Sequence, residues 1–167
     1  MSLNENTKKL CGFCVSDWHF ITMITPYINE KINNGEDVRI YTEKDMTNLI
    51  KTFLSKLTIK EETRQNLISL DWNKKAIDEE IEETKGKYIT IIVNGTNQYI
   101  SELNKRINER FEKENDINIT IINIFDVSQF KQNVYEILSK HDKVLNTSGE
   151  KEIAEVFENY ADKRNAL

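Results

Sequence analysis

Six short apolar runs alternate along the chain with longer segments in which apolar residues recur at helical spacing. The helical spacing is clear where Phe20, Ile24 and Ile28 return every fourth residue, which predicts a helix with one buried face. The short runs predict strands at residues 10–15, 38–41, 67–70, 88–93, 117–125 and 143–145. Parallel strands need crossover connections, and helices supply them. The pattern therefore predicts a three-layer α/β/α fold with a mostly parallel sheet of about six strands. We expect one domain over residues 1–167, with residues 1–8 as a flexible tail.

The pattern also makes more specific predictions for individual elements. Residues 88–93 are almost continuously apolar, which is typical of a central strand covered on both faces. Residues 73–85 are predicted as an acidic surface helix that ends at Gly86. A last helix is expected after Thr147 and Glu150, whose side chains could cap it. The inward residues of the helix before the sixth strand are predicted to be Phe130, Val134, Ile137 and Leu138. Those of the last helix are predicted to be Ile153, Val156, Phe157 and Tyr160.

Composition and charge narrow the function classes. The chain is 38% hydrophobic and 31% charged, which is a globular composition, and its net charge is −5. Direct binding to nucleic acid is disfavoured, because it needs a concentrated cationic surface and no Lys/Arg run reaches five residues. No stretch approaches the length of apolar residues that spans a membrane, and the first residues do not resemble a signal peptide. We therefore expect a cytoplasmic protein that does not contact a membrane.

Two cysteines form the motif that most suggests chemistry. Cys11 and Cys14 are spaced as C-x-x-C before a predicted helix, as in thioredoxin-like redox proteins. That fold also needs a preceding strand and a later cis-proline, and no proline follows Pro26. A zinc site would need His19 and His141 to converge on thiols that point to opposite faces if both lie in a strand. We therefore expect two structural thiols and no metal site.

Phosphate-binding and catalytic motifs are missing. A P-loop after the first strand would read G-x-x-x-x-G-K-[ST], but residues 14–18 contain neither glycine nor lysine. The sequence Asn94-Gly95-Thr96 at a strand-to-helix turn could hold an anion on helix N–H groups, or could simply be a turn. With only two histidines, no Ser-His-Asp set can be argued from spacing. We expect no cofactor and no catalytic residues, so the protein is not predicted to be an enzyme.

The predicted strand ends supply the first candidate binding residues. In open parallel sheets, ligands bind outside the carboxyl ends of the strands. Two tryptophans and several small polar groups there would suit a small organic ligand. These residues are Cys14, Ser16, Asp17, Trp18, Asp71, Trp72, Asn94, Thr96 and Asp126. The other interpretation is that the Asp, Ser and Thr side chains only cap helices, and the sequence leaves both open.

The closing segment resembles that of the MEDS domain, the sensory domain of methanogens and methylotrophs named for the repressor of dichloromethane metabolism. The resemblance is carried by Ile124-Phe125-Asp126, Phe130, Ile137-Leu138, His141, Val144 and Gly149. The opening segment is similar in Leu10-Cys11-Gly12-Phe13, Pro26-Tyr27-Ile28, Asn34-Gly35-Glu36 and residues 38–41. The resemblance covers most of the chain, although residues 58–87 match poorly. Two positions depart from the pattern: Lys9 and Cys14 stand where the family has a histidine opening the first strand and a tyrosine near its end.

The resemblance implies a RecA/KaiC-like (P-loop-derived) topology that has lost the phosphate-binding loop. It also implies a signalling module for small, hydrocarbon-derived molecules, of a kind often followed by a DNA-binding or kinase segment and so linked to transcription regulation. Because this chain carries no such segment, we expect it either to act through a partner protein, such as a regulator or a kinase, or to be an isolated sensor. Asp126 and His141 match the family pattern, and His141 joins the candidate ligand-binding residues. The departure at Lys9 leaves open whether the histidine's role is kept.

Three functions are therefore weighed. The first is a non-catalytic cytosolic sensory domain that binds a small molecule and signals through a partner. The second is an enzyme, either a thiol oxidoreductase or a divergent nucleotide-binding enzyme. The third is a protein-interaction scaffold that uses the acidic residues 73–85 as a docking face. The sequence leaves a homodimer open in each case.

Overall fold

The computed structural model describes residues 6–127 and 134–158. Its first half contains β1 (Thr7–Cys14), α1 (Asp17–Asn33), β2 (Asp37–Thr42), α2 (Thr47–Ser55) and α3 (Glu61–Ile68). Its second half contains β3 (Tyr88–Gly95), α4 (Asn97–Phe111), β4 (Asn118–Asp126), α5 (Val134–Leu138), β5 (Lys143–Asn146), β6 (Gly149–Lys151) and α6 (Ile153–Val156).

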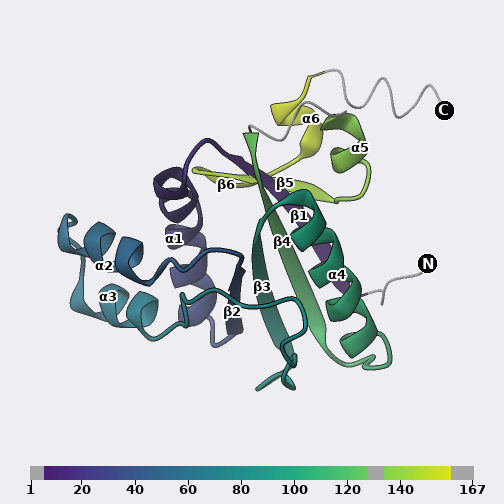
Figure 1. Ribbon diagram of the computed structural model, residues 1–167, viewed down its shortest axis with the longest axis horizontal. Helices are drawn as coiled ribbons and strands as arrows, with labels where there is room; N and C mark the ends of the chain where they lie inside the picture. Colours follow the sequence, from purple (N-terminus) through teal and green to yellow (C-terminus); the bar gives the residue numbers. More distant parts are fainter. Residues whose placement is uncertain (1–5, 128–133, 159–167) are drawn as a thin grey trace.

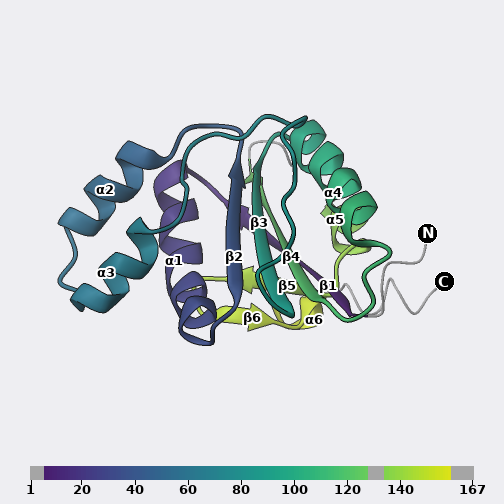
Figure 2. The ribbon, with the colours of Figure 1, turned by 90° about the horizontal axis from the view of Figure 1, so that it is seen from below.

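The strands form one sheet in the order β2-β3-β4-β1-β5-β6. All neighbouring pairs are parallel except β5 and β6, which form an antiparallel hairpin at one edge. Helices cover both faces of this sheet (Figure 1). The predicted three-layer α/β/α fold with a mostly parallel six-stranded sheet is confirmed. Figure 2 shows α1, α2 and α3 on one face and α4 and α5 on the other.

Each face of the sheet has its own hydrophobic core. Successive side chains of a strand point to opposite faces, so Leu10 packs in one core and Cys11 in the other. We call the first core the α1 face; its largest members include Phe20, Ile24, Ile50, Leu54 and Leu67. We call the second the α4 face; it includes Ile91, Ile100, Leu103, Ile107 and Leu138. Strands β3 and β4 are buried on both sides, which the apolar run at residues 88–93 predicted for β3.

The predicted strand at residues 67–70 is wrong. Leu67 and Ile68 form the last turn of α3, and Leu67 is fully buried against the α1 face. A short apolar run cannot distinguish a strand from the end of a helix, and here Glu61 and Glu62 favour a helix start in the preceding turn. The sixth strand is instead β6, which lies at the edge of the sheet opposite β2.

The predicted acidic helix at residues 73–85 is also wrong. Residues 73–87, which we call the strap, contain no helix. The strap covers the α4 face beside β2 and β3, where only Ile81 is deeply buried. Its acidic residues 78–80, 82 and 83 are exposed. With so few apolar side chains and so many like charges at neighbouring positions, a helix would gain little from packing.

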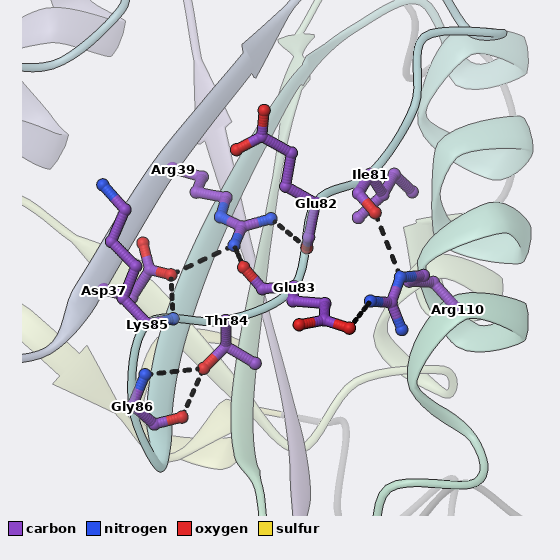
Figure 3. Close-up of polar contacts among 9 residues, drawn as sticks. All are labelled: Asp37, Arg39, Ile81, Glu82, Glu83, Thr84, Lys85, Gly86 and Arg110. Carbon is purple, nitrogen blue, oxygen red and sulfur yellow. Dashed lines mark hydrogen bonds and ion pairs between the residues drawn. The ribbon is translucent and has the colours of Figure 1, made fainter.

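Arginine and tyrosine side chains take the place of helical hydrogen bonds in the strap. Arg39 of β2 donates to the carbonyl oxygens of Glu82 and Glu83 and pairs with Asp37, whose carboxylate also accepts from the Lys85 N–H (Figure 3). From α4, the carbonyl groups of the strap receive three further bonds, donated by Tyr99 to Lys75, by Arg106 to Ile77 and by Arg110 to Ile81. The strap is therefore held by tertiary contacts that no local sequence pattern encodes.

Arg39→Met is expected to release this part of the strap. The variant leaves two carbonyl groups and the Asp37 carboxylate without the guanidinium, so the free energy of unfolding should fall by about 2 kcal/mol. Hydrogen exchange of the amides of residues 82–86 should accelerate more than that of β3. Lys51→Met, at an exposed position of α2, is the control. Unchanged exchange in the strap would show that Arg39 does not anchor it.

The two ends of the chain differ from the sequence-based boundaries. Thr7 and Lys8 belong to β1 and pair with β4, so they are not part of a tail. Thr147 lies in the β5–β6 turn and Glu150 in β6, where Gly149 adopts a φ of 103°. The predicted helix cap is therefore wrong: the short helix α6 is capped by Glu152 in a capping box with Glu155. Phe130 and Tyr160 lie outside the described residues.

Candidate functional site

A pocket of about 420 Å³ lies on the α4 face, between α4 and α5. One stripe of α4 lines it, made of Asn97, Ile100, Ser101, Asn104, Lys105 and Asn108. The spacing of these residues places them along one side of the helix. From α5 and the residues after it come Glu136, Ile137, Lys140 and His141. Strands β1 and β4 add Lys9, Asn123 and Phe125. This volume is in the range of small-molecule sites.

A buried hydrogen-bond network joins α4, β4 and the segment that follows α5. Asn104 of α4 and Asn123 of β4 bond each other through both amides, at 2.7 and 3.0 Å. The Asn123 amide nitrogen also lies 3.0 Å from Nε2 of His141, and the His141 Nδ1 lies 2.7 Å from the Ile137 carbonyl oxygen. All three side chains are less than 10% exposed. Buried polar groups that are fully bonded fix a single arrangement of the elements that carry them.

The bonding partners also fix the protons of this network. A carbonyl oxygen only accepts, so the Asn104 amide nitrogen faces the Ile100 carbonyl oxygen, at 2.8 Å, and its second proton goes to Asn123. Asn123 is thereby oriented to donate to Nε2 of His141. Nδ1 must carry the ring proton, because it faces another carbonyl oxygen. His141 is therefore a neutral ring that donates from Nδ1 and accepts at Nε2.

Burial lowers the pKa of His141 to about 4. The charges of Lys9 and Lys140 act in the same direction, while the bond to the Ile137 carbonyl oxygen and the charge of Asp142 oppose it. An imidazolium would also lose the bond that Nε2 accepts from Asn123. At neutral pH the floor of the pocket is thus polar and uncharged.

Lys9 introduces a cation beside this neutral floor. It lies within β1, on the same face of the sheet as Cys11, and it is only partly exposed. Burial lowers the pKa of its ammonium group and the charge of Lys140 adds to the effect, while the charge of Asp142 opposes it. Across residues 6–127 and 134–158, no carboxylate forms an ion pair with this ammonium. Nearby Asp142 accepts from the Lys9 backbone N–H at 2.8 Å.

Part of the predicted strand-end group does assemble at the carboxyl edge of β1 and β4. Cys14 and Asp126 end these strands side by side, and the charges of Asp126 and Asp17 both act on the Cys14 thiol. Asp17 pairs with Lys44 at 3.4 Å. Trp18 is 40% exposed and packs edge-on against Phe53 of α2, with ring centres 5.1 Å apart. Of these residues Cys14 is buried in the α1 face, and none of them lines the α4–α5 pocket.

Several predicted site residues have structural partners. Ser16 caps α1 and Thr96 caps α4, each accepting a backbone N–H of the first turn. The Thr96 N–H donates to the Glu43 carboxylate at 2.8 Å, so a carboxylate of the chain itself occupies this N–H. Asn94 is buried and donates to the Ile124 carbonyl oxygen at 3.0 Å. The capping interpretation therefore holds for Ser16 and Thr96.

Asp71 and Trp72 follow a helix instead of a strand, because the strand predicted before them is the end of α3. Trp72 is 3% exposed and its indole N–H donates to the Leu67 carbonyl oxygen at 2.7 Å, which satisfies the C-terminal end of α3. Asp71 is exposed and pairs with Lys75 at 3.7 Å. The tryptophan is thus a core residue and not part of an open binding surface.

The thiols are poorly placed for redox or metal chemistry. Cys11 and Cys14 lie in different cores, on opposite faces of the sheet. Burial raises their pKa values to about 12 and about 11, so both thiolates are disfavoured. His19 accepts from the Val15 N–H, away from His141. Within the described residues, no group of three or more His, Cys, Asp or Glu side chains could hold a metal ion.

Sequence reasoning selected His141 but missed its partners Asn104 and Asn123. Asn123 interrupts the apolar residues of β4, and a polar residue inside a buried strand indicates a specific hydrogen-bond partner. Asn104 stands on the buried side of α4 between Ile100 and Ile107. Lys9 was noted only as a departure from a family pattern, although its place in the pocket makes it a candidate binding residue.

Comparisons with known proteins give no further guide to this site. A scan against family models finds no match, and comparisons with the curated proteins and with solved structures find none either. Among the described helices, none has the length and apolar character to cross a membrane. The fold and the pocket thus define an α/β domain with a small-molecule-sized site between two helices, and its function must be argued from that site.

Proposed function

We propose that this protein is a non-catalytic, cytoplasmic sensory domain of the MEDS type, which binds a small molecule between α4 and α5 and signals through a partner protein. The observation that carries the proposal is the pocket itself, whose floor is the buried network of Asn104, Asn123 and His141. Its volume suits a small ligand, and its polar groups are preorganised by bonds to one another.

The residues of the family resemblance support the same site. Phe125, Ile137 and His141 carry the resemblance in the sequence, and all three line the pocket. Lys9, at the position where the family has a histidine, lines it too. A RecA/KaiC-like origin without the P-loop agrees with the turn after β1, where the Ser16 hydroxyl caps α1 and no glycine-rich loop is present.

A ligand in this position would act on the spacing of α4 and α5. These helices face each other across the pocket, and α5 leads through His141 into β5. A ligand that contacts both helices stabilises one spacing relative to others, and a partner that recognises this surface reads the difference. No bond in the ligand needs to change, which is why the function is proposed as non-catalytic.

Ligand binding to the pocket tests the proposal. In a thermal-shift screen of small metabolites, a ligand at about 100 times its Kd should raise the free energy of unfolding by about 3 kcal/mol and Tm by about 5–10 °C. Ser101→Phe, on the pocket side of α4, should abolish this shift. Glu102→Phe, at the next residue and outside the pocket lining, should keep it.

Two results would contradict the proposal. One is the absence of a shift for every compound in the screen. The other is a shift that is equal in Ser101→Phe and in the unmodified protein, which would place the binding site elsewhere. Turnover of a bound compound would favour the enzyme hypothesis over a sensory role.

A further inference from the structure

The pocket between α4 and α5 is strongly asymmetric in charge. Among the described residues, three lysines line it and only one carboxylate does, that of Glu136. Lys9 comes from β1, Lys105 from α4 and Lys140 from the residues after α5. The fold therefore gathers three cations from separate parts of an acidic chain around one cavity. Such a cluster favours an anionic ligand.

Lys9 is the central member of this cluster. Lys105 and Lys140 are exposed, whereas Lys9 is partly buried beneath the helices. Within the described parts of the chain its ammonium forms no ion pair, and the charge of Asp142, which accepts from the Lys9 backbone N–H, offsets the effect of burial only in part. A partly buried ammonium that lacks an ion pair costs free energy. A ligand carboxylate in the pocket would remove that cost by pairing with Lys9.

The rest of the lining favours a hydrocarbon body on this anion. Ile100, Phe125 and Ile137 supply apolar surface, and the neutral network beside them bears no charge. The pocket reaches Asn97, the first residue of α4, but most of its lining consists of side chains along the helices, whereas phosphate groups are typically held by backbone N–H groups at helix N-termini. The Thr96 N–H, which precedes α4, is already bonded to Glu43. A carboxylate therefore fits this pocket better than a phosphate.

We infer that the ligand of this site is a small organic acid, whose carboxylate pairs with Lys9 while its hydrocarbon part lies against Ile100, Phe125 and Ile137. Lys140 and Lys105 at the rim attract the anion and contribute weaker contacts. This inference rests on the proposed function, and it names the chemical class of the ligand that the sensory domain would detect.

Matched pairs of probes test the inference by calorimetry. Acetate, hexanoate, benzoate and phenylacetate are each compared with the corresponding neutral amide, and phenyl phosphate is the second anion. Pairing with a charged partner predicts that the best acid binds about tenfold or more tightly than its amide. Its affinity should fall as the salt concentration rises. Phenyl phosphate should bind more weakly than phenylacetate.

Lys9→Met separates the charge of Lys9 from its bulk. Since burial disfavours the ammonium, this variant should keep the stability of the unliganded protein. It should weaken binding of the acid about tenfold or more and change that of the amide less than about twofold. Lys9→Arg should retain most of the preference for acids. Lys140→Met should act in the same direction with a smaller effect, and Lys51→Met on α2 should have none.

The outcomes separate this inference from the proposed function. If no acid and no amide binds while the thermal-shift screen finds another ligand that Ser101→Phe blocks, the inferred ligand class is refuted and the site stands. If the screen finds no ligand either, the proposed function is refuted. If amides bind as tightly as acids, or if both Lys9→Met and Lys140→Met leave the preference for acids unchanged, the site stands and the inferred ligand class is refuted. Tighter binding of phenyl phosphate than of phenylacetate would refute the choice of carboxylate.

Discussion

Asn123→Ala should lower the free energy of unfolding by about 3 kcal/mol, well above the effect of a typical substitution. Asn123 bonds Asn104 twice and His141 once, and all three side chains are buried. Its removal leaves the Asn104 side-chain oxygen, one Asn104 amide proton and the His141 Nε2 without the partners that Asn123 provided, and each buried group left unpaired costs about 1–3 kcal/mol. Urea unfolding followed by circular dichroism measures the loss through the transition midpoint.

Asn48→Ala, at an exposed position of α2, is the matched control for this experiment and should change stability by less than about 0.5 kcal/mol. A double-mutant cycle gives the sharper test. Asn104→Ala and Asn123→Ala remove the same reciprocal bonds, so their combined effect should be clearly smaller than the sum of the single effects. Additive losses would show that the two amides do not form one network.

The second large effect is a loss of folding stability at acidic pH. The pKa of His141 is lowered to about 4 in the folded protein, from about 6.5. Between these values the unfolded chain binds a proton that the folded protein does not, so stability rises with pH in this window. The stability that depends on a neutral His141 is fully present above about pH 6.5. It is lost as the pH falls to about 4, and the free energy of unfolding then decreases by roughly 3 kcal/mol in total.

Urea midpoints at several pH values between about 4 and 7 would measure this dependence. Glutamine in place of His141 does not titrate, so His141→Gln should be less stable at neutral pH but should show a flatter profile. Nuclear magnetic resonance of the ring would report the titration of His141 directly. A ring that becomes protonated near its ordinary pKa in the folded protein would contradict the buried, neutral state.

The alternation of apolar runs and amphipathic segments was enough to predict the class of fold. Period-two burial in strands and helical spacing between them follow from backbone geometry, so β1, β2, β3, β4 and β5 were found at nearly their observed positions. The C-terminal parts of the pattern were less informative. Helix α6 and the β5–β6 hairpin are short, and short elements carry few periodic residues.

The candidate site was predicted only in part. His141 was selected through a family resemblance, but the carboxyl edge of the sheet received most of the candidate residues. The pocket lies beside that edge, on the α4 face, because Lys9, Asn104 and Asn123 come from three elements whose side chains meet there. The sequence around each of these residues does not predict that it lies close to the other two.

The sequence by itself determined the strands β1 to β5, the long helices α1 and α4, and which side of each is buried, since these depend on local spacing and burial. Only the tertiary structure decided that residues 73–87 form a strap, because its hydrogen bonds come from side chains of β2 and α4. It also decided that a lysine, two asparagines and a histidine share one pocket. That arrangement depends on the strand order, which places β1 between β4 and β5, and strand order is set by packing across the whole sheet.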